Sequence, residues 1–253
     1  MPENWKSYFA NVNGKPSSIA LDLALREHAP MPAKAWLLWV WIYLRDPGPN
    51  GMTSQAEFPT ISAIEHELTQ ELGTRCQAIY AGRVTGERRR ELYFYGADKK
   101  DFKRAVKNTM SGFRSYRYDF DAQHEPDWNQ YFNVLFPSDE AMEKIKNQDV
   151  LEALMKRGDD LKDVRDVHHW IYFKTAKDRE WYASKVRELG YIIEDETQDQ
   201  KEGQPCGLTI TRDQAVTPDA TDNAVLELFR LAKQVNADYD GWEAQLISKA
   251  DSN

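Results

Sequence analysis

The order of strands and helices that the sequence predicts occurs twice along the chain, and this repeat restricts the fold more than any single motif. After an N-terminal hairpin at residues 5–24, alternation and helical spacing predict strand, helix, strand, strand, helix and strand within residues 1–137. The same order follows in residues 138–250. The sequence therefore predicts an α+β chain of two tandem ferredoxin-like (β-α-β-β-α-β) sandwiches with antiparallel sheets, the first with extra flanking hairpin strands.

We place the boundary between the two predicted domains at Pro137-Ser138-Asp139, which follows a strand predicted at Tyr131–Phe136 and begins the next helix. A chain of 253 residues is long enough for two domains of ordinary size, here residues 1–137 and 138–250. In each sandwich both helices are expected to cover one face of the sheet. The other face is then solvated, or covered by a partner or by the neighbouring domain.

The negative charge of the chain is concentrated in its second half. The net charge is −8; residues 1–137 hold 17 Lys and Arg against 16 Asp and Glu, whereas residues 138–253 hold 16 against 25. An acidic domain repels nucleic acid phosphates and attracts basic surfaces. Solubility alone would also explain the excess of carboxylates.

Five carboxylates of the second half fall close together, in a segment predicted to be a loop between two strands. They are Glu194, Asp195, Glu196, Asp199 and Glu202. One interpretation is a solvated connector. The other is a docking surface for an arginine-rich partner segment, because guanidinium groups form bidentate, charge-assisted hydrogen bonds with carboxylates.

The sequence predicts no catalytic residue, no cofactor and no metal site, because it contains no nucleophile motif, P-loop or GxGxxG pattern. His168 and His169 are adjacent in a predicted strand and therefore point to opposite faces. Asp166 and His168 share a face, but two ligands are fewer than the three that a catalytic zinc ion needs. An enzyme of unknown class remains a further hypothesis.

Two features bear on the compartment. Cys76 and Cys206 stand alone and match no zinc or redox spacing, which fits a reducing, cytoplasmic location. The longest apolar run, Ala35 to Leu44, is about half as long as the roughly 20 residues of a membrane helix, so we predict no contact with a membrane. The sequence leaves the oligomeric state open.

RNA binding by the first domain is an alternative function. RNA-recognition domains share the ferredoxin-like order and stack bases on aromatic side chains of the sheet. Here Arg88, Arg89 and Arg90 precede Tyr93 and Tyr95. The segment lacks the glycine of the corresponding RNA-binding motif, so an ordinary charged surface remains the competing interpretation.

The string Asp238-Tyr239-Asp240-Gly241-Trp242, which enters the last predicted strand, resembles the C-terminal strand of the regulator of ribonuclease E activity B (RraB) family. Gly158-Asp159 resembles the Gly-Asp turn of that family, and His168-His169 resembles its first strand. RraB proteins are small bacterial proteins that bind and inhibit an RNA-degrading endonuclease. The resemblance implies a cytoplasmic regulatory or adaptor protein that acts by binding another protein. Its target, by the same resemblance, would be a ribonuclease E-type RNA-degradation machine.

The first half is similar to a bacterial domain of unknown function that often precedes an RraB-like domain. The similarity lies in Trp5-Lys6, the run from Trp36 to Tyr43, Tyr93-Phe94-Tyr95 and Trp128-Asn129-Gln130-Tyr131. No activity follows from it.

Within the last strand, alternation predicts that Trp242 lies under the helices while Tyr239 and Gly241 face the other side. Tyr239, with Asp238, Asp240 and the acidic segment, is therefore a candidate for contact with a partner. Glycine at position 241 indicates either close packing against another group or a bend in the strand.

Overall fold

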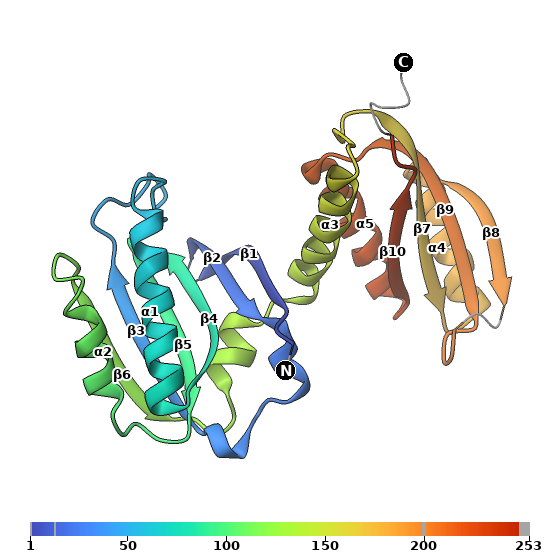
Figure 1. Ribbon diagram of the computed structural model, residues 1–253. Helices are drawn as coiled ribbons and strands as arrows, with labels where there is room; N and C mark the ends of the chain where they lie inside the picture. Colours follow the sequence, from blue (N-terminus) through green and yellow to red (C-terminus); the bar gives the residue numbers. More distant parts are fainter. Residues whose placement is uncertain (1, 13, 199–200, 248–253) are drawn as a thin grey trace. The chain divides into compact units, whose positions relative to one another are not determined.

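The computed structural model describes residues 2–12, 14–198 and 201–247. The chain divides into two compact units, with the division between Ala141 and Met142 (Figure 1). Each unit consists of helices packed on an antiparallel sheet, so the predicted α+β class and tandem ferredoxin-like order are confirmed. In the part of the chain that the structure describes, no helix is both long and apolar enough to cross a membrane.

The first unit contains a sheet of six strands in the order β1-β2-β4-β5-β3-β6. Its strands and main helices are β1 Trp5–Val12, β2 Lys15–Asp22, β3 Trp36–Tyr43, α1 Phe58–Cys76, β4 Ile79–Gly86, β5 Arg89–Gly96, α2 Phe102–Met110 and β6 Tyr118–His124. Without the β1–β2 hairpin, the order β4-β5-β3-β6 is that of a ferredoxin-like sheet. Short 3-10 helices at Leu23–Glu27 and Pro32–Lys34 connect the hairpin to β3.

Both faces of the first sheet are covered within the unit. Helices α1 and α2 bury one face around Leu38, Ile64 and Phe94. The segment after β6 covers the other face, where the Trp128 ring stacks on Tyr95 with ring centroids 3.8 Å apart.

The prediction of a strand at Tyr131–Phe136 is wrong, because Tyr131–Leu135 forms a short π-helix. The buried residues Trp128, Tyr131 and Leu135 recur every three or four positions, which is a helical spacing and not the alternation of a strand. Packing on the second face of the sheet therefore selects the helix.

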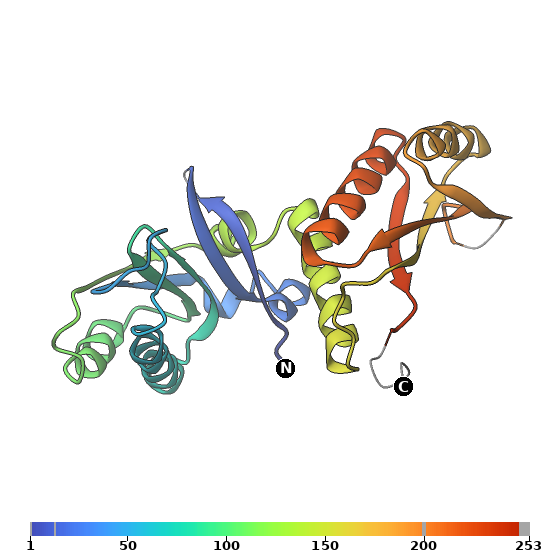
Figure 2. The ribbon, with the colours of Figure 1, turned by 90° about the horizontal axis from the view of Figure 1, so that it is seen from above.

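The second unit has a sheet of four strands in the order β10-β7-β9-β8, the ferredoxin-like order. Its elements are α3 Asp139–Lys156, β7 Val164–Phe173, α4 Ala176–Glu188, β8 Ile192–Gln198, β9 Cys206–Ala215, α5 Pro218–Gln234 and β10 Asp238–Ala244. Helices α4 and α5 lie on the same face of this sheet (Figures 1 and 2). Leu151 and Leu154 of α3 join the core that the two helices form with the sheet.

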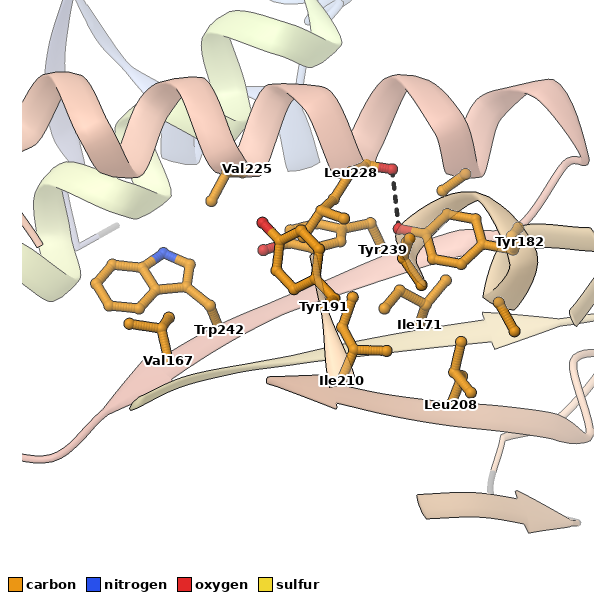
Figure 3. Packing of buried hydrophobic residues seen from close by; sticks show 14 of the residues in the cluster. Val167, Ile171, Tyr182, Tyr191, Leu208, Ile210, Val225, Leu228, Tyr239 and Trp242 are labelled. Atoms are coloured by element: carbon orange, nitrogen blue, oxygen red, sulfur yellow. Dashed lines mark hydrogen bonds between the residues drawn. The ribbon is translucent and has the colours of Figure 1, made fainter. Parts of the chain in front are cut away.

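A β-bulge in β10 overturns the predicted orientation of Tyr239. Tyr239 lies opposite Ile171 and Gly241 lies opposite Trp170, so Asp240 is an extra residue without a partner on β7. The bulge shifts the alternation by one position, and Tyr239 and Trp242 both point between the sheet and α5 (Figure 3). Gly241 has a φ of +132° and no atom within 4 Å of the place of a Cβ atom, so it is there for the bend and not for close packing.

Candidate protein-interaction surface

The face of the second sheet that α4 and α5 do not cover carries a row of aromatic side chains. Alternation along β7 puts Val167, His169 and Ile171 into the core and leaves His168, Trp170 and Tyr172 partly exposed on the other face. We call this second face the open face.

The strand register arranges the open face in three cross-strand rows, each centred on one aromatic residue of β7. From β10 to β8 the rows are Glu243–His168–Thr211–Ile192, Gly241–Trp170–Thr209–Asp195 and Asp238–Tyr172–Gly207–Thr197. Gly241, Thr209 and Gly207 are too short to cover the rings beside them. Trp170 and Tyr172 therefore form an aromatic platform between two strands that carry carboxylates.

One cation of the chain itself is held on this face. The Lys201 ammonium lies 5.0 Å from the centre of the Tyr172 ring. It forms salt bridges with Asp238 and, at 2.8 Å, with Asp240. Partial burial alone would lower the pKa of Lys201, but the hydrogen bonds to the two carboxylates outweigh it and raise the pKa. The open face thus binds a cation between an aromatic ring and carboxylates.

Further carboxylates on the open face repel one another. Asp166 of β7 lies directly opposite Asp213 of β9, and both side chains are exposed. Like charges in directly opposed positions destabilise a sheet. A cation bound here from outside the unit would reduce this repulsion.

The predicted acidic loop is mostly strand, since β8 includes Glu194, Asp195 and Glu196. Glu194 pairs with Nδ1 of His168 at 2.7 Å, and Asp195 lies on the open face by register. Glu196 instead forms a salt bridge at 2.9 Å with Arg179 of α4, on the helix side. Glu202 is exposed in the following loop, and Asp199 lies outside the described residues.

Tyr239, predicted as a contact for a partner, is a core residue. Its side chain is 3% exposed, and its hydroxyl lies 2.8 Å from Nδ1 of His169. Burial raises the pKa of Tyr239 well above its ordinary value, so the hydroxyl keeps its proton. Burial, with smaller contributions from Arg212 and His168, lowers the pKa of His169 to about 3. The predicted opposite orientation of His168 and His169 agrees with the structure.

The pKa of His169 is about 3 in the folded unit and 6.5 ordinarily. Between these pH values the unfolded chain binds a proton at His169 and the folded unit does not. Stability is therefore retained above pH 6.5 and lost as the pH falls toward 3, by up to about 1.4 kcal/mol per pH unit from this group. Urea denaturation at several pH values is expected to show a smaller loss for His169→Phe than for the wild type. Equal losses in the two proteins would contradict this role of His169.

The Gly158-Asp159 signature is structural. Gly158 has a φ of +93° and ends α3, where its N–H donates to the Met155 carbonyl at 3.0 Å. The Asp159 carboxylate is buried and forms a salt bridge with Arg165. It also accepts hydrogen bonds from the backbone N–H groups of Leu161 and Ile247. These contacts fix the loop between α3 and β7 against the end of the described chain.

The structure does not form the RNA-binding surface that was predicted as an alternative. Tyr93 and Tyr95 are buried, so neither ring is available for stacking with a base. Arg90 is buried as well, and Arg89 pairs with Glu91. Arg88 alone among the three arginines is exposed, in the turn between β4 and β5.

The first unit contains a cleft of about 750 Å³ between α1, β4 and the N-terminal strand. At its base, Glu65 accepts hydrogen bonds from Tyr80 at 3.0 Å, from Arg83 at 2.7 Å and from Arg90 at 2.8 Å. These side chains pair their charges and hydrogen-bonding groups with one another, as in a structural ion-pair network. Over the ranges that the structure covers, no three His, Cys, Asp or Glu side chains are grouped to hold a metal ion.

Sequence reasoning missed Trp170, Tyr172 and Lys201 as members of the candidate surface. The alternation of His168, Trp170 and Tyr172 within the predicted strand was a sufficient signal for the aromatic row. The acidic segment and the family signatures are stronger local signals, and neither includes Trp170 or Tyr172.

Comparisons with known proteins find a family model that matches each unit. No curated protein matches the chain. One solved structure, the crystal structure of an unknown protein from Galdieria sulphuraria, is 11% identical, with 84% of this chain and 98% of that chain covered at a TM-score of 0.22. Residues 3–136, more than half of the chain, match a family of unknown function (DUF695), and residues 144–244 match the regulator of ribonuclease activity B (RraB). The chain therefore belongs to the DUF695 family, and the segment after its DUF695 domain matches the RraB family model.

Proposed function

We propose that the chain is a non-enzymatic, cytoplasmic regulatory or adaptor protein whose acidic C-terminal domain, residues 138–250, binds a basic segment of a partner protein. The match of residues 144–244 to a family of ribonuclease regulators is the observation that carries this proposal. The charge of the chain supports it, because residues 138–253 hold 16 Lys and Arg against 25 Asp and Glu. Such a domain attracts a basic segment at long range and speeds the encounter.

The finer proposal is that the basic segment belongs to the scaffold of a ribonuclease E-type RNA-degradation machine. Scaffold regions that bind RNA are rich in arginine and lysine, because phosphates must be neutralised. A protein that occupies such a segment with carboxylates would compete with RNA for it. Regulation would then need no catalytic group on this chain.

Pull-down of a ribonuclease E-type scaffold by the purified full-length chain tests this function. We expect micromolar binding at low salt that weakens markedly as the salt concentration rises, because exposed charges are screened over about 10 Å at 0.1 M ionic strength. The isolated catalytic region of the ribonuclease, without its basic segments, serves as the control. Absence of salt-sensitive binding to the scaffold at micromolar concentrations would contradict the proposal.

A further inference from the structure

We propose that the open face of the second sheet binds an extended, arginine-bearing segment of a partner protein, with a guanidinium group stacked on Trp170. This inference rests on the proposed function and adds the docking site and the residue type that it selects. The acidic edge strand alone would attract any cation. The aromatic row is what distinguishes arginine from lysine.

The position of the aromatic row requires recognition by side chains. β7 lies between β10 and β9 in the sheet, so neighbouring strands already pair its backbone N–H and C=O groups. A partner segment cannot add to β7 as a strand and must lie across the face. The partly exposed Trp170 ring is an accessible platform there, because its row neighbours Gly241 and Thr209 are short and a Cβ atom at Gly241 would meet nothing within 4 Å.

A guanidinium group matches this platform better than an ammonium group. It is planar, it stacks on aromatic rings, and its edge donates two parallel hydrogen bonds to a carboxylate. Asp195 lies at the β8 end of the Trp170 row. Glu243 lies on β10, on the other side of Trp170, in the neighbouring row of His168. Within the described ranges neither carboxylate forms an ion pair. An arginine on Trp170 would therefore reach a carboxylate on either side.

Lys201 provides an intramolecular precedent for the proposed contact. Its ammonium group lies over the Tyr172 ring and bridges Asp238 and Asp240 at the end of the same face. The pairing of ring and carboxylate therefore already holds a cation at one row. The row of Trp170 offers a larger ring, with Asp195 at its β8 end and Glu243 in the neighbouring row on β10.

Charge complementarity favours a basic protein segment over other occupants. Two copies of the chain that met through this face would bring their carboxylates together, which like charges oppose. RNA phosphates and anionic lipid headgroups are repelled for the same reason. Exposed Ile192, which shares a row with His168, offers an apolar contact at the β8 edge for side chains between the arginines.

The test compares two labelled peptides of equal length and charge, one of alternating arginine and serine and one of alternating lysine and serine. Fluorescence anisotropy with the full-length chain at low salt is expected to show about fivefold tighter binding of the arginine peptide. Trp170→Leu keeps an apolar side chain but removes the aromatic face. This variant is expected to lose the preference for arginine, while its thermal unfolding midpoint shows that the fold is retained.

A pair of charge reversals separates the open face from the helix side. Glu243→Lys lies on the open face, and Glu188→Lys makes the same change at an exposed position of α4. Measured at about 0.1 M salt, where exposed charges are screened over about 10 Å, Glu243→Lys is expected to weaken binding of the arginine peptide about tenfold and Glu188→Lys to change it by about twofold or less. The first variant thus reports on the docking site and the second on net charge.

The outcomes distinguish the docking site from the proposed function. Equal affinity for both peptides, unchanged in Trp170→Leu and equally reduced by the two charge reversals, would overturn the docking site and leave a general acidic binder. No binding of either peptide to the wild type at low salt would overturn the proposed function as well. A self-associated dimer in sedimentation experiments that Glu243→Lys dissociates would identify a second copy as the occupant and would also overturn the inference.

Discussion

Replacing Asp159 by alanine is expected to lower the free energy of unfolding of the C-terminal unit by about 3–5 kcal/mol, because the change leaves a buried arginine without its counterion. The side chains of Arg165 and Asp159 are 4% and 0% exposed. The carboxylate accepts hydrogen bonds from Arg165 Nη1 at 2.5 Å and Nη2 at 3.0 Å, and from the N–H groups of Leu161 at 2.8 Å and Ile247 at 2.9 Å. Arg165 Nη1 would keep only the Gln245 carbonyl, at 3.0 Å, whereas Nη2 and the two backbone N–H groups would lose the carboxylate that accepts from them.

The effect of Asp159 also depends on pH. The hydrogen bonds from Arg165, partly opposed by burial, lower the pKa of Asp159 from 3.8 to about 2. The folded pKa is below the unfolded one, so the stabilisation is present above pH 3.8 and disappears as the pH falls through 2. Urea denaturation of the full chain at neutral pH, with hydrogen exchange of β7 and β10 to assign the transition, measures the loss.

Asp163→Ala is the matched control, because Asp163 is an exposed aspartate of the same loop. Its loss of stability is expected to stay within about 0.5 kcal/mol. A loss below about 1 kcal/mol for Asp159→Ala would mean that solvent reaches Arg165 after the substitution, contrary to its burial.

The order of strands and helices was predictable from the sequence because each element carries its own periodicity. Val167–Phe173 alternates, and the stripe of Val225, Leu228 and Ala232 recurs at helical spacing, so the sandwich order of the second unit follows without tertiary information. Two of the departures from the prediction are places where packing decides. Tyr131–Leu135 is helical because it covers the second face of the first sheet. Tyr239 points into the core because of a β-bulge in β10 that the amino-acid composition does not predict.

The candidate surface was predictable only in part, because it depends on strand register. The carboxylates Glu194 and Asp195 were visible in the sequence, but whether Glu196 joins them depends on the bulge within β8 between Ile193 and Asp195. That bulge turns Glu196 toward Arg179 on the helix side. Family signatures identified residues that build the fold, such as Asp159. Two of the three side chains in the aromatic row, Trp170 and Tyr172, lie outside those signatures.

Glu65 of the first unit is expected to be as important for stability as Asp159 is for the second. Its carboxylate is the counterion of two arginines, Arg83 and Arg90, and accepts a hydrogen bond from the Tyr80 hydroxyl. The Arg90 side chain is 5% exposed, whereas that of Arg83 is 28% exposed. Burial lowers the pKa of Arg90, and Glu65 opposes that shift. The ion pairs thereby join α1 to β4 and β5.

Glu65→Ala is therefore expected to lower the free energy of unfolding of the first unit by about 3–5 kcal/mol, since Arg90 would remain buried as an unpaired cation. Arg83→Ala removes a partly solvated partner and should lower it by about 1 kcal/mol. Glu67→Ala, an exposed glutamate on the same helix, is the control and should change it by less than about 0.5 kcal/mol. Urea denaturation, assigned to this unit by hydrogen exchange of β4 and β5, measures all three.

The ranking of the variants Glu65→Ala and Arg83→Ala is the decisive result. If both variants lower the free energy of unfolding equally, water solvates the Arg90 guanidinium once Glu65 is removed. The ion pairs then contribute less to stability than the burial of Arg90 indicates. If Glu65→Ala dominates, Arg90→Ala would also disturb the fold, because Glu65 would keep only the partly solvated Arg83 as its cation. Loss of RNA affinity in an Arg90 variant would then report unfolding. Arg88→Ala, at an exposed position in the β4–β5 turn, is the substitution that tests RNA binding by the first unit without this ambiguity.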